Sequence, residues 1–126
     1  MQRRIFIPVV FLTFLTFSLA GNQIVSKSDS LRRLIGKTGS KAEIFNQLAE
    51  LWIDSLPEES AAFADSALLA AGSTEEKARA YYNKGEAFYF LNENEKALEA
   101  YTQALNLFME SGMLKQQANC FITIGI

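Results

Sequence analysis

Apolar residues recur three or four positions apart along most of the chain after residue 40, which is the spacing of one face of an α-helix. Pro57 suits the first turn of a helix, and Gly112 suits a helix C-terminus. No segment shows the sustained alternation that is typical of a strand. The predicted fold class is therefore all-α, with helices near residues 28–35, 41–54, 57–71, 74–91, 94–111 and 114–126.

Polar residues mark the boundary between two of these helices. Ser73 and Glu76 have the spacing of a capping box, in which a hydroxyl and a carboxylate satisfy free backbone amides at a helix start. Gly72, just before them, is expected to end the preceding helix in the left-handed conformation that glycine adopts easily.

One stretch carries a specific pattern of small and aromatic residues. It consists of Tyr81, Gly85, Phe88, Ala97, Tyr101 and Ala104. A glycine inside a helix costs roughly 1 kcal/mol relative to alanine, so Gly85 predicts that a second helix approaches closely there. Tyr101 is expected to fill the space between the two helices, and Lys84 to pack its stem with its ammonium at the edge.

The pattern recurs on both sides. Phe45 and Ala49 repeat it upstream, with Ala49 36 residues before Gly85, and Phe121 and Gly125 repeat it downstream, with Gly125 40 residues after Gly85. The pattern resembles the tetratricopeptide repeat, a helix-turn-helix unit of about 34 residues. An ordinary helical hairpin with chance spacing is the alternative.

The resemblance implies an array over residues 41–126, with repeats near 42–77 and 78–117 and a partial one at 118–126. It implies a right-handed solenoid of antiparallel helix pairs, about two and a half repeats long. It also implies a non-catalytic scaffold whose partner is a protein or peptide segment.

In such arrays the first helix of each pair lines a concave groove. The resemblance places there Arg79, Tyr82, Asn83, Glu86, Tyr89 and Phe90 from the central repeat, Asn46, Glu50 and Ile53 from the first, and Asn119 and Thr123 from the third. Tyr82, Tyr89 and Phe90 predict an aromatic groove for an apolar peptide. The alternative is that these rings pack between repeats.

One branch of the family binds chaperones by clamping a terminal carboxylate with lysine, asparagine and arginine. Asn83 falls on one asparagine position of that clamp, but the lysine and arginine positions hold Asn46, Asn119 and Thr123. The resemblance therefore does not support a carboxylate clamp.

The N-terminus has the layout of a secretory signal peptide at residues 1–20. Arg3 and Arg4 precede an apolar run, and Ser18 and Ala20 stand three and one places before Gly21. We predict cleavage after Ala20 and export to the periplasm, with an uncleaved membrane anchor at residues 5–20 as the alternative. Residues 21–40 are predicted to form a linker and a short leading helix.

Composition narrows the chemistry. The 126 residues carry a formal net charge of −2, which argues against a nucleic-acid partner, and they include no histidine, the commonest general base. The paired glutamates stand at helix starts, where they complement the helix dipole. No metal or cofactor motif is present, and Cys120 is expected to be a core packing residue. We therefore expect no enzyme activity and no cofactor.

The C-terminal segment ends inside the third repeat's first helix, so we expect the start of a longer protein. The spacing of the repeats and the segment 104–112 also resemble the exported repeat region of bacterial membrane sensor kinases and regulators. The alternative function is therefore the N-terminal part of a sensor histidine kinase whose catalytic part lies beyond residue 126.

Overall fold

The computed structural model describes residue 26, residues 29–30, residue 33 and residues 39–125. Residues 39–125 form five α-helices and no strand, which confirms the all-α class for this part of the chain. The helices are α2 (Lys41–Trp52), α3 (Pro57–Ala70), α4 (Thr74–Phe90), α5 (Asn94–Glu110) and α6 (Leu114–Ile124). Each begins and ends within two residues of its predicted bounds.

The predicted N-terminal elements lie largely outside the described residues. The signal peptide at 1–20 is wholly outside them, as is most of the linker and leading helix at 21–40. Residues 26, 29, 30 and 33 are helical.

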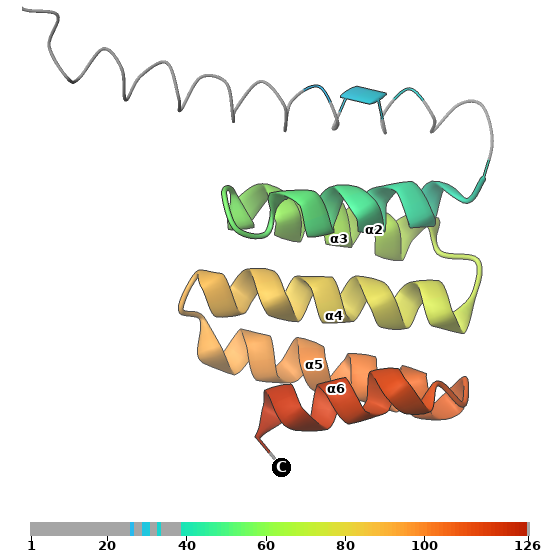
Figure 1. Ribbon diagram of the computed structural model, residues 1–126, viewed down its shortest axis with the longest axis vertical. Helices are drawn as coiled ribbons and strands as arrows, with labels where there is room; N and C mark the ends of the chain where they lie inside the picture. Colours follow the sequence, from blue (N-terminus) through green and yellow to red (C-terminus); the bar gives the residue numbers. More distant parts are fainter. Residues whose placement is uncertain (1–25, 27–28, 31–32, 34–38, 126) are drawn as a thin grey trace, which may run out of the picture.

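The helices are stacked in sequence order, each antiparallel to its neighbour (Figure 1). Helices α2 and α3 form one hairpin and α4 and α5 a second, while α6 packs on α5. Helix α4 also contacts α2, two helices back along the chain. The first helices of the two hairpins therefore lie beside each other.

Side-chain caps begin two of these helices. The Ser40 hydroxyl accepts a hydrogen bond from the Glu43 amide at 3.4 Å, and the Ser73 hydroxyl accepts one from the Glu76 amide at 3.1 Å. The Glu76 carboxylate accepts the Gly72 amide at 2.8 Å, so both halves of the predicted capping interaction are present. Hydrogen bonds from the Ser40 hydroxyl and the Gly72 amide lower the pKa of Glu76.

The prediction for the backbone of Gly72 is wrong. Helix α3 ends through Ala71 in an extended conformation (φ −63°, ψ 126°), and Gly72 does not have a positive φ. The Glu76 carboxylate satisfies the Gly72 amide, so no left-handed turn is needed to bring that amide back to a carbonyl of α3. Gly112 does adopt the left-handed conformation (φ +73°) after α5, as expected for a residue that ends a helix.

The close contact between α4 and α5 depends on the absence of a side chain at Gly85. A Cβ placed on Gly85 would lie 2.6 Å from Cδ1 of Tyr101, far inside van der Waals contact. Tyr101 is only 3% exposed, and Ala97 and Ala104 on its face of α5 are buried as well. The expected close approach at Gly85, with Tyr101 filling the space between the helices, is confirmed.

The core is dominated by alanine, which keeps the stacked helices close. Its largest fully buried apolar side chain is Leu48, and near α6 the core adds Leu105, Phe108 and Cys120. Cys120 is fully buried, as expected for a packing residue, and burial raises the pKa of its thiol to about 11. The reactive thiolate is therefore disfavoured at neutral pH.

Lys84 forms an ion pair that links α4 of the second hairpin to α3 of the first. Its ammonium lies 2.8 Å from the Asp65 carboxylate in α3 and 5.8 Å from the centre of the Phe88 ring. The side chain is about a quarter exposed, which fits the expected packed stem with the charge at the edge.

The Gly85 contact generates a stability prediction. Gly85→Leu should destabilise the protein by about 2 kcal/mol or more, because overpacking against the Tyr101 ring outweighs the better helix propensity of leucine. Urea unfolding followed by circular dichroism measures the change. Gly72→Ala is the control, since a Cβ there meets only a side-chain oxygen at 3.9 Å. Equal stability of the Gly85→Leu and Gly72→Ala variants would show that the helices do not need this close approach.

Candidate binding groove

A groove runs across the face formed by α2, α4 and α6. Its volume is about 480 Å³. The residues that line it are Glu50, Ile53, Glu75, Arg79, Tyr82, Asn83, Glu86, Phe108, Met113, Gln116 and Asn119. Apart from Phe108, they come from these three alternating helices or from the residues just next to them. The groove therefore lies on one face of the stack, opposite to Lys84.

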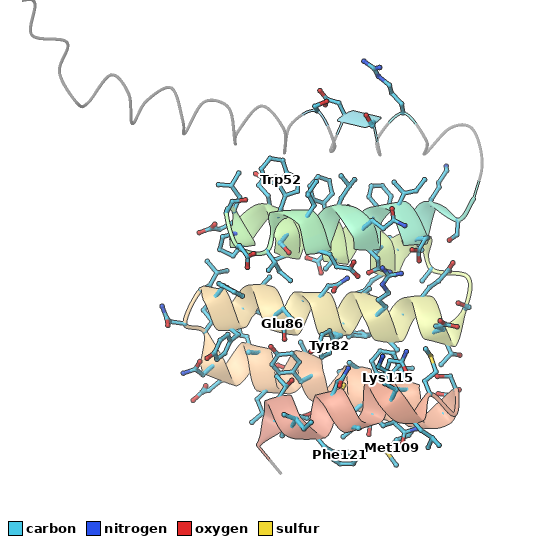
Figure 2. The ribbon with its side chains drawn as sticks, viewed as in Figure 1. Trp52, Tyr82, Glu86, Met109, Lys115 and Phe121 are labelled. Carbon is cyan, nitrogen blue, oxygen red and sulfur yellow. The ribbon has the colours of Figure 1, made fainter. Side chains whose placement is uncertain are left out.

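Most of the predicted groove residues meet here. Arg79, Tyr82, Asn83 and Glu86 extend along α4, with Glu50 and Ile53 on one side and Asn119 on the other. Figure 2 shows Tyr82 and Glu86 on the side of α4 that faces α5 and α6. Residues spaced by three or four positions share a face of a helix, which is why one periodic pattern places the α4 residues together.

Four predicted residues lie outside the groove, namely Asn46, Tyr89, Phe90 and Thr123. Asn46 is fully buried, because its position on α2 points at α4 rather than at the open face. Tyr89 and Phe90 occupy the last turn of α4, where they are 61% and 46% exposed and pack edge to face on each other. We expected Tyr82, Tyr89 and Phe90 to line the groove together. Of these three rings, Tyr82 lines the groove and the other two do not.

A charged cluster joins α2 to α4 at the groove. The Arg79 guanidinium donates to Glu43 at 2.6 Å and to Glu50 at 2.8 Å. Burial lowers the pKa of Arg79, but its hydrogen bonds with Glu50 and Glu43 outweigh this and raise the pKa. For Glu43, burial alone would raise the pKa. The hydrogen bonds from Gln47 and Arg79 outweigh this effect, so the pKa of Glu43 is lowered. The positive charge of Arg79 is therefore compensated within the protein.

Two asparagines form a buried connection beneath the groove. The Asn83 side-chain amide donates to Oδ1 of Asn46 at 3.1 Å, and the Asn46 amide donates to the Glu76 carbonyl at 3.3 Å. Asn83 is only 3% exposed. Asn83, which the sequence resemblance placed at a clamp position, has its amide hydrogens directed into α2 rather than toward the groove.

Tyr101, which is buried in α5, supports the groove residues Tyr82 and Glu86. The Tyr101 hydroxyl donates to Glu86 at 2.7 Å, and the rings of Tyr82 and Tyr101 lie 5.6 Å apart. Burial raises the pKa of both tyrosines, and the negative charge of Glu86 raises it further. Both hydroxyls are therefore protonated at neutral pH and can act as hydrogen-bond donors.

Sequence reasoning missed the groove residues Glu75, Phe108, Met113 and Gln116. Glu75 and Gln116 stand one helical turn before Arg79 and Asn119, so extending the helical period backwards would have found them. Phe108 and Met113 carry no such signal. They reach the groove because the end of α5 and the start of α6 turn back toward α4.

Comparisons with known proteins found no match: no family model, no curated protein and no solved structure is similar to this chain. In the part of the chain that the structure describes, no helix has both the length and the apolar character needed to span a membrane.

The asparagine pair generates a second prediction. Asn46→Ala or Asn83→Ala should each cost about 1–3 kcal/mol of unfolding free energy, because each leaves a buried polar partner unsatisfied. The double variant should cost clearly less than the sum of the two, since the remaining amide is removed as well. Urea unfolding measures all three, with the exposed Asn106→Ala as the control. Strictly additive losses would mean that the two amides do not interact.

Proposed function

We propose that this chain is a non-catalytic protein-interaction scaffold of the tetratricopeptide type, which binds a protein segment in the groove of α2, α4 and α6. The observation that carries the proposal is that alternating helices line one continuous groove. In tetratricopeptide arrays, which the sequence resembles, the first helix of each pair lines the concave face of the stack. The Tyr81, Gly85 and Tyr101 pattern and its echoes support the same assignment.

The groove suits a polypeptide partner. Its walls combine apolar surface from Tyr82 and Met113 with polar groups from three helices. Aromatic residues that are half-buried in a pocket are the usual anchors of protein interfaces. The side chains of Arg79, Asn83 and Glu86 are held by hydrogen bonds inside the protein, so a partner would not have to order these three groups when it binds.

A free C-terminal carboxylate is not the expected ligand. Arg79 is the one lysine or arginine among the groove's described lining residues, and its guanidinium is already shared by two glutamates. An incoming carboxylate would compete with those glutamates and be repelled by them. We therefore propose recognition of an internal segment of a partner protein.

Export through residues 1–20, or anchoring through residues 5–20, forms part of the same proposal and would place the groove outside the cytoplasm. The N-terminal sequence of the mature chain in its native host tests this part. A catalytic kinase region beyond residue 126 stays a prediction.

The proposal predicts a sterically sensitive groove. We expect selection from a library of displayed peptides against the full chain to yield binders that Asn119→Trp weakens at least about tenfold, because the indole occupies the space that the peptide needs. Tyr82 is less suitable for this test, since its ring also packs on the core. Fluorescence anisotropy with labelled peptides measures the affinities.

Asn106→Trp is the matched control, because it makes the same substitution at an exposed site of α5 that does not line the groove. Binders that Asn106→Trp weakens as much as Asn119→Trp, or the absence of any specific binder, would refute the groove as a protein-binding site.

A further inference from the structure

The charges that line the groove are unbalanced. Glu50, Glu75 and Glu86 contribute three carboxylates, while Arg79 contributes the one guanidinium. That guanidinium is paired with Glu50 and with Glu43 outside the groove. Within residues 39–125, neither Glu75 nor Glu86 forms a salt bridge. These two carboxylates are therefore not paired with a cation in the described part of the chain.

Glu86 is the best placed of these carboxylates. It is partly buried, and the Tyr101 hydroxyl holds it from below at 2.7 Å. This bond fixes the position of the carboxylate and occupies only part of its capacity, because an ionised carboxylate can accept about four hydrogen bonds. Glu86 also lines the groove.

Apolar surface also lines the groove, and Tyr82 stands one helical turn before Glu86 on α4. Tyr82 and Met113 pack against the core cluster, of which Phe108 is a buried member (4% exposed), and all three line the groove. A partner that covers this surface would exclude water and reduce the effective dielectric constant, so a charge pair formed beneath it would be stronger than one on an open surface. The same surroundings would make the burial of a second anion unfavourable.

We propose that the segment bound in this groove is basic: a lysine or arginine side chain pairs with Glu86 while an apolar side chain of the same segment packs on Tyr82 and Met113. The proposal rests on the function proposed above and specifies the chemistry of its partner. The charge preference is opposite to that of a groove that clamps a carboxylate. Charge complementarity selects this occupant over an acidic or purely apolar segment.

The positions of the two unpaired carboxylates also predict a spacing in the partner. Glu75 and Glu86 are separated by 11 positions on α4, which corresponds to about 16 Å along the helix axis. An extended peptide rises about 3.3 Å per residue, so a second basic residue about five positions from the first would reach Glu75.

Capped synthetic peptides test the proposal directly. The probe is a peptide of about twelve residues with two lysines five positions apart among leucine, alanine and glutamine, acetylated and amidated so that its ends carry no charge. The comparison peptide has glutamate in place of both lysines. We expect the full chain to bind the lysine peptide at least about tenfold more tightly than the glutamate peptide, as measured by fluorescence anisotropy.

Charge-removing variants then locate the interaction. Glu86→Gln keeps an oxygen acceptor for the Tyr101 hydroxyl. It should reduce the affinity for the lysine peptide about fivefold, because a hydrogen bond to a charged group becomes one to a neutral group. Glu99→Gln removes the same charge from an exposed site of α5 outside the groove and should change the affinity little. Raising the salt concentration from about 50 mM to about 500 mM should weaken binding of the lysine peptide more for the wild type than for the Glu86→Gln variant.

The outcomes separate this inference from the proposed function. Suppose that the selected peptides lose affinity for the Asn119→Trp variant but are acidic or uncharged. This result would overturn the proposal of a basic partner and leave the proposed scaffold function intact. Equal binding of the lysine and glutamate peptides, or equal effects of Glu86→Gln and Glu99→Gln, would also overturn it. The absence of any groove-specific peptide refutes the proposed function itself. A selected set enriched in lysine and arginine, together with a specific effect of Glu86→Gln, supports both.

Discussion

The close contact between Gly85 and the Tyr101 ring is the constraint on which the rest of the structure depends. It brings the axes of α4 and α5 together, because no Cβ separates the ring from the backbone of α4. The same ring extends its hydroxyl to Glu86 and lies beside Tyr82. A single packing contact in the second hairpin therefore also sets the position of the charge and the aromatic surface in the groove.

Polar contacts join the first hairpin to the second, in addition to the packing of small buried apolar residues. The Arg79 cluster, the buried asparagine pair and the Lys84–Asp65 bridge all cross from α2 or α3 to α4. An alanine-rich core buries little apolar area per residue, so directional contacts are needed to fix how the hairpins are aligned. Because the Arg79 cluster and the asparagine pair lie at the groove, its shape is tied to the alignment of the helices.

These same contacts decide which groups remain available to a partner. Arg79 and Asn83 look like ligand-binding residues by type, yet their donors are used inside the protein. Glu75 and Glu86 are the charged groove residues without a salt bridge in the described part of the chain. The groove is therefore negative although it contains an arginine, and its preference depends on internal pairing rather than on residue composition.

The sequence by itself determined the helices, their ends and the Gly85 contact. These features follow from local rules: the helical period, the chemistry of caps, and the steric need for a glycine where two helices meet. The period also placed Arg79, Tyr82, Asn83 and Glu86 on one face of α4. It could not tell which of them would be buried, since every residue on a face shares the same spacing.

Only the tertiary structure decided the depth and partners of each side chain. Asn46 is buried because α2 packs on α4, and Tyr89 and Phe90 lie beyond the groove because it does not extend to the last turn of α4. Phe108 and Met113 enter the groove through the turn from α5 to α6, which brings together residues that no helical period relates. Gly72 does not adopt the left-handed conformation, because the Glu76 carboxylate of α4 accepts a hydrogen bond from its amide. Each of these outcomes depends on contacts between helices, and a local pattern holds no information about such contacts.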